Sequence, residues 1–369
     1  MQGNGPRWGK CSLNIHDLAR HLNVSIGTVS RALNGRSDVS AETRERVIEA
    51  AAKLGYSPNQ SGRSLRQGAT GMIGFMIATT HERAAKGEAF FMSVLDGLQP
   101  YLAERGLDVV VLLCTGDQDP FAYLRRVVER RIADAMIIAE TERIDPRIDY
   151  LAKRKLPFVA FGRSLSGGEH SWLDLDFEGV AEQSIDRLTR LGHKRIAIAT
   201  ASNEINYGYL FVDACRAALA RRDIVLDDGL VMREPLSEAG GFRIGERLIA
   251  LDELPSAVLL VDNKMATGLY HQLYDAGVIP GRDIAVIGFD DSPQAQYLSP
   301  ALTCFRVSLA DLGRKLGETL IAAMDAGKSG TRPWQTVWPM EMVVGKSDGF
   351  RPRGVRRAGA HREPEGTSV

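Results

Sequence analysis

The feature that most constrains the fold is an alternation, from Gly71 onward, of short apolar runs with amphipathic helical segments. The apolar runs are MIGFMIA (72–78), LDVVVLLC (107–114), ADAMIIA (133–139), PFVAFG (157–162), RIAIAT (195–200), AVLLVDN (257–263) and DIAVIGFD (283–290). Helical patterns lie between them at 90–106, 120–131, 178–192 and 268–277. Buried runs that alternate with helices predict parallel sheets in an α/β arrangement.

These runs are too many for one small sheet, and a break near HSWLDLDFEG (170–179) divides them into two similar halves. We therefore expect two α/β lobes. The first combines residues 71–174 with 304–330, and the second combines 175–303 with 331–346. Because parallel sheets bind ligands outside the carboxyl ends of their strands, a cleft between the lobes is the expected ligand site.

The length of 369 residues exceeds what one hydrophobic core usually serves, so two or three domains are expected. No run approaches the ~20 apolar residues of a membrane helix, and the N-terminus lacks the apolar region of a secretory signal. Cys11, Cys114, Cys215 and Cys304 lie far apart and form no CxxC pair. This spacing favours reduced thiols in a cytoplasmic protein over a zinc site or a disulfide framework, and no cofactor is expected.

The net charge of zero hides an asymmetry between the two ends of the chain. Residues 1–70 hold ten Lys or Arg and five Asp or Glu, so this segment carries +5 and the remainder −5. A small basic domain joined to a larger acidic one is typical of a protein whose first part meets a polyanion. A chance distribution of surface charge is the alternative interpretation.

Three helical patterns occupy the first domain, which we place at residues 12–57. The first, NIHDLARHL, has Ile15, Leu18, Ala19 and Leu22 at helical spacing. The second begins at Ser25, a good N-cap, and carries Val29 and Leu33 on one face. The third follows Ser40, has the apolar stripe Val47, Ile48, Ala51 and Leu54, and ends at Gly55 before Pro58.

The first two helices fit a helix-turn-helix, in which the second helix presents its exposed side chains to the major groove of DNA. Arg31 is the side chain best suited to a bidentate bond with guanine, and Thr28 and Ser30 could assist it. Ser25 and Thr28 could bond phosphates, and Ile26 could contact a thymine methyl group. Gly27 is exposed as well but has no side chain with which to read a base.

Two polar segments flank the predicted α/β region. Residues 58–70 read as a linker with one isolated apolar residue, Leu65, between two arginines. The tail at 347–369 is rich in Arg, Gly and Pro and lacks apolar periodicity, so it is expected to be disordered. It contains no leucine heptads and therefore predicts no tetramerising coiled coil.

Because several long motifs occur in the same order and spacing, the chain closely resembles the LacI/GalR family of bacterial transcription regulators over residues 12–346. The motifs that carry the resemblance are VSIGTVSRALNG (24–35), VSAETRERV (39–47), AAKLGYSPN (51–59), GRSLR (62–66), RLGHKRIAIA (190–199), PSAVLLVDNKMATG (255–268), DIAVIGFDD (283–291) and LSPALT (298–303). A weaker similarity around FVAFGR and WLDLD points to the subgroup that senses α-glucosides. A free-standing periplasmic sugar-binding protein has the same two-lobed fold, but the DNA-binding head and the missing signal peptide disfavour that alternative.

The resemblance implies an all-α helix-turn-helix head followed by a two-lobed, periplasmic-binding-protein-like sensing region with parallel sheets. It also implies a cytoplasmic homodimer that binds a pseudo-palindromic operator, most often as a repressor, and a small-molecule effector, here a sugar, between the lobes. A regulator of the same family that senses another ligand is the alternative. Effector binding would shift operator affinity through its different affinity for two states of the protein.

The resemblance gives the linker a role as a hinge helix whose leucine, Leu65 here, wedges into the minor groove and kinks the DNA. The family usually has alanine where this chain has Gly62, and glycine lowers helix propensity by about 1 kcal/mol. The alternative is that Leu65 packs against the lobes. The full set of expected DNA-binding residues is Ser25, Ile26, Gly27, Thr28, Ser30, Arg31, Asn34, Tyr56, Asn59, Arg63, Ser64 and Leu65.

The expected effector residues come partly from pattern and partly from the resemblance: Phe90, Phe91, Arg163, Trp172, Asp174, Asp176, Asn206, Tyr207, Asp262 and Phe289. A tryptophan face beside carboxylates suits a sugar, because the ring stacks on C–H faces while hydroxyls donate to Asp. Core packing is the alternative for Phe90 and Phe91, and helix capping is the alternative for Asp174 and Asp176.

One position departs from the family, because Phe211 stands where an effector-binding arginine is common. This difference argues against a strongly anionic ligand and leaves Asn206 and Tyr207 as nearby polar substitutes. The sequence has no GxSxG, HExxH or Walker A motif and no GxGxxG after a strand, so we expect no enzyme. A sugar-modifying enzyme is the least favoured alternative.

Overall fold

The computed structural model describes residues 14–33, 36, 38–56, 69–78, 89–116, 118–291, 293–329 and 332–349. The chain divides into two compact units, Met1–Thr70 and Gly71–Val369. No helix in the described part is long and apolar enough to cross a membrane.

The described residues of the first unit form the helices α1 (Ile15–Leu22), α2 (Ile26–Leu33) and α3 (Ala41–Leu54). A polar residue precedes each helix: Asn14, Ser25 and Ser40. Asn14 and Asp17 form a reciprocal capping box at the start of α1. Its core contains Leu18, Ala19, Val29, Ala32, Val39, Val47 and Ala51. One predicted core residue is wrong: Ile48 is 51% exposed, because the buried stripe of α3 runs through its neighbour Val47 to Ala51 instead.

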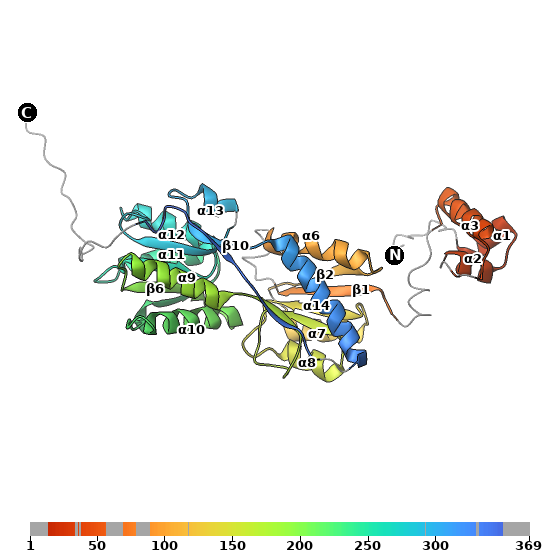
Figure 1. The fold of residues 1–369 in the computed structure, drawn as a ribbon, viewed down its shortest axis with the longest axis horizontal. Coiled ribbons are helices and arrows are strands. Elements are labelled where there is room, and N and C mark those ends of the chain that lie inside the picture. The colour runs from red at the N-terminus through yellow and green to blue at the C-terminus, as the bar shows by residue number, and fades with distance from the viewer. Residues whose placement is uncertain are drawn as a thin grey trace, which may run out of the picture. The chain divides into compact units, whose positions relative to one another are not determined.

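The second unit contains two six-stranded sheets. The first sheet has the order β11 (Gln335–Trp338), β5 (Trp172–Leu175), β4 (Phe158–Phe161), β3 (Ala135–Ala139), β1 (Met72–Ala78) and β2 (Asp108–Cys114), and all neighbours are parallel. Helices α6 (Ala89–Ala103) and α14 (Leu309–Ser329) pack together on this sheet, and α7 (Pro120–Glu129) packs with α8 (Pro146–Arg154) (Figure 1).

The second sheet has the order β12 (Glu341–Val343), β10 (Thr303–Arg306), β9 (Ala285–Asp290), β8 (Ala257–Leu260), β6 (Ile196–Ala201) and β7 (Val231–Glu234). Only the β10–β12 pair is antiparallel. The helices are α9 (Phe177–Arg190), α10 (Asn206–Ala220), α11 (Glu238–Ile249), α12 (Lys264–Asp275) and the short α13 (Pro293–Tyr297). The predicted fold class, a helical head followed by a two-lobed α/β region, is confirmed.

The chain passes between the two sheets three times: after β5, between β10 and α14, and between β11 and β12. The first passage falls at the predicted break. The other two differ from the predicted bounds, because β10 (Thr303–Arg306) lies in the second sheet and β11 (Gln335–Trp338) lies in the first. β11 escaped detection because it is a four-residue edge strand whose residues alternate between exposed and half-buried.

The predicted start of a disordered tail at residue 347 is also wrong, because Ser347 and Asp348 are fully buried. Ser347 Oγ accepts a hydrogen bond from the backbone N–H of Thr303 and donates to the carbonyl of Val286. Asp348 pairs with Arg187 of α9 and accepts a bond from the hydroxyl of Thr303. These polar anchors hold the segment in lobe 2 without an apolar pattern; residues beyond 349 lie outside the described residues.

Helices α6 and α14 approach so closely that glycine is required at the crossing. A Cβ atom at Gly97 would lie 1.9 Å from the carbonyl oxygen of Ala310, and one at Gly313 would lie 1.9 Å from that of Val94. Both obstacles are backbone atoms, which a side-chain rearrangement cannot move. This contact fixes α14, although it is late in the sequence, to the first lobe.

Candidate DNA-binding head and effector site

The turn before α2 is closed by its own polar side chains. Ser25 Oγ accepts a hydrogen bond from the backbone N–H of Thr28 at 3.1 Å and lies 2.9 Å from Thr28 Oγ1. Ser25 therefore caps α2, as predicted from the sequence. Ile26 is 38% exposed at the start of the same helix, so it lies free for a contact outside the head.

Arg31 lies back along α2 toward its start. Its Nε is 3.3 Å from the carboxylate of Asp38, and its side chain is 50% exposed. A Cβ atom at Gly27 would lie 3.4 Å from Arg31 Nη1. Glycine at this position therefore leaves space for the guanidinium of Arg31. The contact with Asp38 is through Nε, so the guanidinium has further N–H donors that could reach a guanine edge.

The other predicted DNA-binding residues fall into two groups. Ser30 and Tyr56 are half-buried in the head, and burial raises the pKa of the Tyr56 phenol. Five predicted residues lie outside the described residues: Asn34, Asn59, Arg63, Ser64 and Leu65.

In lobe 1, two neighbouring phenylalanines at the start of α6 have different surroundings. Phe91 is buried and meets Phe75 edge-on at 5.9 Å between ring centroids. Phe90 is half-buried and stacks on Phe161 at 6.2 Å with an interplanar angle of 17°. Phe91 therefore belongs to the core, and Phe90 is the one of the two that is accessible.

In lobe 2, three rings form a stack. Phe177 lies between Tyr207, at 5.2 Å and 2°, and Phe289, at 4.8 Å and 15°. Phe289 is only 5% exposed, and its ring centroid lies 6.2 Å from that of Phe211 in an edge-on contact. Phe289 is therefore the buried end of the stack. Tyr207 is the half-buried outer ring.

Arg163, which follows β4, is held by two carboxylates. Its Nε donates to Asp174 at 2.7 Å, and its two terminal nitrogens donate to the two oxygens of Glu178 at 2.7 Å each. Burial lowers the pKa of the guanidinium, but the bonds to Glu178 and Asp174 outweigh it and raise that pKa above its usual range. The guanidinium also lies 5.6 Å from the ring centroid of half-buried Trp172.

The two aspartates of WLDLD have separate roles. Asp174 is 4% exposed, and burial raises the pKa of its carboxyl to about 6 although Arg163 lowers it. Asp176 caps α9, because its Oδ1 accepts the backbone N–H of Gly179 at 2.8 Å. The capping alternative therefore applies to Asp176 and not to Asp174.

A second pair of carboxylates lies at the carboxyl ends of β8 and β9. Asp262 follows β8, and its Oδ1 accepts the backbone N–H of Lys264 at 2.8 Å. Asp290 ends β9, and burial followed by the negative charge of Asp262 raises the pKa of its carboxyl. Asn263 ties the two strand ends together, accepting from the N–H of Phe289 at 2.8 Å and donating to the carbonyl of Asp290.

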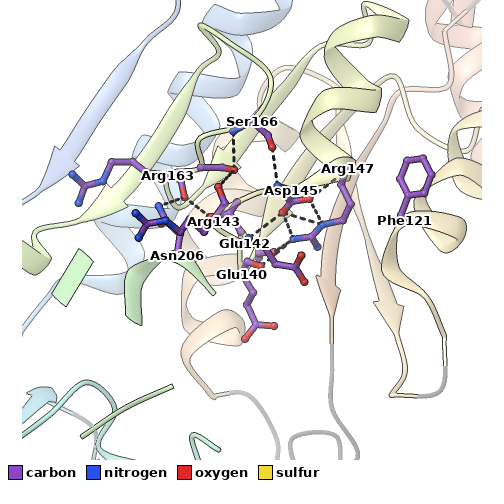
Figure 2. Close-up of polar contacts among 12 residues, drawn as sticks. Phe121, Glu140, Glu142, Arg143, Asp145, Arg147, Arg163, Ser166 and Asn206 are labelled. Atoms are coloured by element: carbon purple, nitrogen blue, oxygen red, sulfur yellow. Dashed lines mark hydrogen bonds and ion pairs between the residues drawn. The ribbon is translucent and has the colours of Figure 1, made fainter. Parts of the chain in front are cut away.

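Asn206 forms hydrogen bonds across the junction of the lobes (Figure 2). Its backbone N–H donates to the carbonyl of Thr141 at 2.9 Å, and its Nδ2 donates to that of Arg163 at 2.8 Å. The N–H of Arg143 donates to the carbonyl of Glu204 at 2.9 Å, and Glu142 and Ile205 form an antiparallel bridge. Residues 141–143 and 204–206 thus bind lobe 1 to lobe 2.

A buried ion pair supports the lobe 1 side of this junction (Figure 2). Arg147 Nη2 lies 2.7 Å from Asp145, and both side chains are at most 4% exposed. The same nitrogen donates to the carbonyl of Glu140 at 3.0 Å, and the N–H of Asp145 donates to Ser166 Oγ at 2.8 Å. The Asp145–Arg147 pair and its hydrogen bonds therefore hold the loop that carries Thr141 and Arg143 in place.

Sequence reasoning missed Phe161, Phe177, Glu178 and Asp290. Asp290 could have been found, because it ends an apolar run in the same way as Asp262 and the same argument applies. Glu178 had no such signal, because a glutamate in the first turn of a helix is common on dipole grounds alone. Its role appears only when Arg163 is seen to reach it.

The comparisons with known proteins agree along the whole described chain. Residues 14–59 match the family model "Bacterial regulatory proteins, lacI family". Residues 73–220 match "Periplasmic binding proteins and sugar binding domain of LacI family", and 185–347 match "Periplasmic binding protein-like domain".

Individual relatives match over most of their length. HTH-type transcriptional regulator AglR of Rhizobium meliloti (strain 1021) is 32% identical over 344 residues, which are 92% of this chain and 95% of the relative. HTH-type transcriptional regulator RafR of Escherichia coli is 32% identical over 76% of this chain and 83% of its own. The solved transcriptional regulator CelR–cellobiose complex has a TM-score of 0.68 at 26% identity and covers 91% of this chain and 99% of that chain.

A helix-turn-helix head joined to a two-lobed α/β region defines a DNA-binding transcription regulator with a sensing domain, not an enzyme. With the family model, the fold and the 32% identity in agreement, the chain belongs to the LacI family of bacterial regulatory proteins.

Proposed function

We propose that the protein is a repressor of genes for carbohydrate uptake or catabolism, controlled by a sugar that binds where the two lobes meet. It acts in the cytoplasm as a homodimer on a pseudo-palindromic operator. The similarity to a CelR structure that holds cellobiose supports a sugar as the effector.

The observation that carries the sugar proposal is the combination of accessible rings with an excess of acid. Phe90, Trp172 and Tyr207 are half-buried rings on which apolar sugar faces can stack. Among the residues proposed for the site, Asp174, Glu178, Asp262 and Asp290 are acids, and Arg163 and Lys264 are cations. This excess repels anions, and Asp262 keeps one carboxylate oxygen for a hydroxyl group because the other accepts the N–H of Lys264.

The proposal is tested by operator gel shift with DNA upstream of neighbouring genes, with and without a panel of mono- and disaccharides. A thermal shift of the purified protein with the same panel measures binding independently of DNA. We expect one sugar class to raise the melting temperature and to change operator affinity.

A planar heterocycle is the second candidate effector, because the stack of Phe177, Tyr207 and Phe289 presents flat ring faces. Purines and organic acids therefore belong in the same thermal-shift panel. A response to one of these together with no response to any sugar would overturn the carbohydrate proposal and leave the regulator intact.

The proposed homodimer has a suitable face on lobe 2. A cavity of about 460 Å³ lies between α11 and α12 and is lined by Glu238, Ala239, Phe242, Arg243, Thr267, Gly268 and His271. Tyr274 on α12 is 43% exposed. Phe242→Arg should shift the protein toward monomer in sedimentation, whereas Val225→Arg, at an isolated side chain that is 91% exposed, should not.

A further inference from the structure

The amino ends of the parallel strands of lobe 1 gather at one edge of the first sheet, and that edge is basic. We define this amino edge by the last turns of α7 and α8 and the connections that lead into β2, β3, β4, β5 and β11. It holds eight exposed cations: Arg105, Arg126, Arg130, Arg131, Lys153, Arg154, Lys155 and Arg332. It holds four acids: Glu104, Glu129, Asp134 and Glu169.

The equivalent edge of lobe 2 provides a comparison for the charge of the amino edge of lobe 1. The last turns of α9, α10, α11 and α12 and the connections into β6, β7, β8 and β9 also hold eight cations, but with eight acids. The expected attraction of cations to helix C-termini applies equally to both lobes. It therefore does not explain why only lobe 1 lacks the balancing acids.

The two edges also differ in how many of their cations form ion pairs. Seven of the eight lobe 2 cations lie within ion-pair distance of an acid: Arg187, Arg190, Arg195, Arg221, Arg222, Arg247 and Arg282. On the lobe 1 edge, only Arg105 has such a partner among the described residues, at 3.6 Å from Glu104. Arg126 and Arg154 lie over tyrosine rings instead. Most cations of the amino edge are thus available to an external anion.

The linker from the DNA-binding head joins lobe 1 at this same edge. The N–H of Gly71 donates to Asp134 at 2.7 Å, and its carbonyl accepts the N–H of Asp108 at 2.9 Å. Residues 57–70 can span at most about 50 Å when fully extended. The linker therefore keeps the end of the head at Tyr56 within about that distance of Gly71 at the amino edge.

We propose that the amino edge of lobe 1 binds the phosphates of DNA that flanks the operator, as a second and sequence-independent contact surface of the regulator. The free Arg and Lys side chains suit phosphate oxygens, and each contact releases counterions from the duplex. This surface lengthens the bound DNA beyond the bases read by the head and steepens the salt dependence of binding.

The test compares two duplexes in fluorescence anisotropy with the full chain. Both carry a site selected from a random-sequence DNA library; one ends at the site, and the other extends two helical turns on each side. The variant carries Arg130→Gln, Arg131→Gln, Lys153→Gln and Lys155→Gln. The control carries Arg190→Gln, Lys194→Gln, Arg216→Gln and Arg247→Gln in lobe 2, with the same change of charge.

We expect the wild type to bind the longer duplex more tightly, with a steeper plot of log K against log salt. The lobe 1 variant should lose this advantage and lower the slope by about 0.9 for each phosphate contact removed, while its affinity for the short duplex stays unchanged. The control should behave like the wild type. Thermal unfolding of both variants checks that they are folded.

Equal behaviour of the lobe 1 variant and the control on the long duplex would overturn the proposal. An equal loss on both duplexes would do so as well, because it would place these cations at the operator itself. If no site is selected by the wild type, the DNA-binding function itself fails, which is a distinct result.

Discussion

At the scale of single residues, the side chains expected to contact ligands are already engaged with one another. Arg31 is bound to Asp38, and Arg163 is bound to Asp174 and Glu178. A ligand at either site therefore meets a guanidinium that is already paired with an acid. Where a new contact replaces such a pair, the net gain is smaller than the new contact alone.

Arg31→Ala should weaken binding to the specific operator by about 1–3 kcal/mol and weaken non-specific binding much less. The reason is that Arg31 is the exposed side chain of α2 best suited to a base edge, whereas phosphate contacts come from elsewhere. Titration of operator and random duplexes at one salt concentration measures both. Asp38→Asn, which frees Arg31 without removing it, should leave the affinity equal or higher; a loss would show that Asp38 itself is needed.

The stability of the sensing unit should depend on the protonation of Asp174. Burial raises the pKa of this carboxyl to about 6 in the folded protein, above its value of 3.8 in a model compound. Between these values the folded state binds more protons than the unfolded state, so the free energy of unfolding rises as the pH falls from 7 to 4. We expect a contribution on the order of 2 kcal/mol.

Chemical denaturation of the wild type and Asp174→Asn at pH 7 and pH 4.5 isolates this contribution. The wild type should gain stability relative to the variant at the lower pH. A difference between the two proteins that stays constant with pH would show that Asp174 does not titrate in this range.

The sequence identifies Arg163 and Asp174 as site residues but does not show that they bind each other. Their pairing depends on β4 and β5 being neighbours in the sheet, with Arg163 after the end of one strand and Asp174 within the other. A side-chain contact between strands requires the register, which no local pattern contains. The bond from Asn206 to the carbonyl of Arg163, across the junction of the lobes, is likewise not contained in any local pattern.

At the scale of elements, the long apolar strands are predictable from the sequence, and the short strands at the end of the chain are not. β1, β3, β8 and β9 are nearly continuous apolar runs because both of their faces are covered. β11 and β12 are three or four residues long and partly exposed, so burial leaves almost no trace in their composition. The predicted boundary between residues 330 and 331 fails for that reason, because β11 belongs to the first sheet.

Helix α14 allows a graded test of packing within one element. Gly313→Ala should lower the free energy of unfolding by more than about 2 kcal/mol, because the new methyl group would meet the backbone of α6. Gly317→Ala, one turn later, meets the ring of Tyr101, which can move, and should cost less. Urea denaturation measures both; equal costs would show that the two helices separate freely.

At the scale of the whole molecule, the linker is expected to couple the sensing unit to DNA. Leu65→Ala should lower affinity for the operator much more than affinity for random DNA, because only the operator complex includes a kinked central step. Titrations of both duplexes at fixed salt measure this difference. An equal loss on both would support the alternative in which Leu65 packs against the lobes.

The three passages between the lobes are bonded to one another. The N–H of Asp176 donates to the carbonyl of Trp338 at 3.0 Å, and Arg306 pairs with Glu341 in the β10–β12 ladder. Three adjacent backbone segments resist stretching and twisting, and bending about their common line deforms them least. We therefore expect the relative motion of the lobes to be mainly a change of one angle about this line. An effector bound between the lobes would then act on the rest of the chain chiefly by setting that angle.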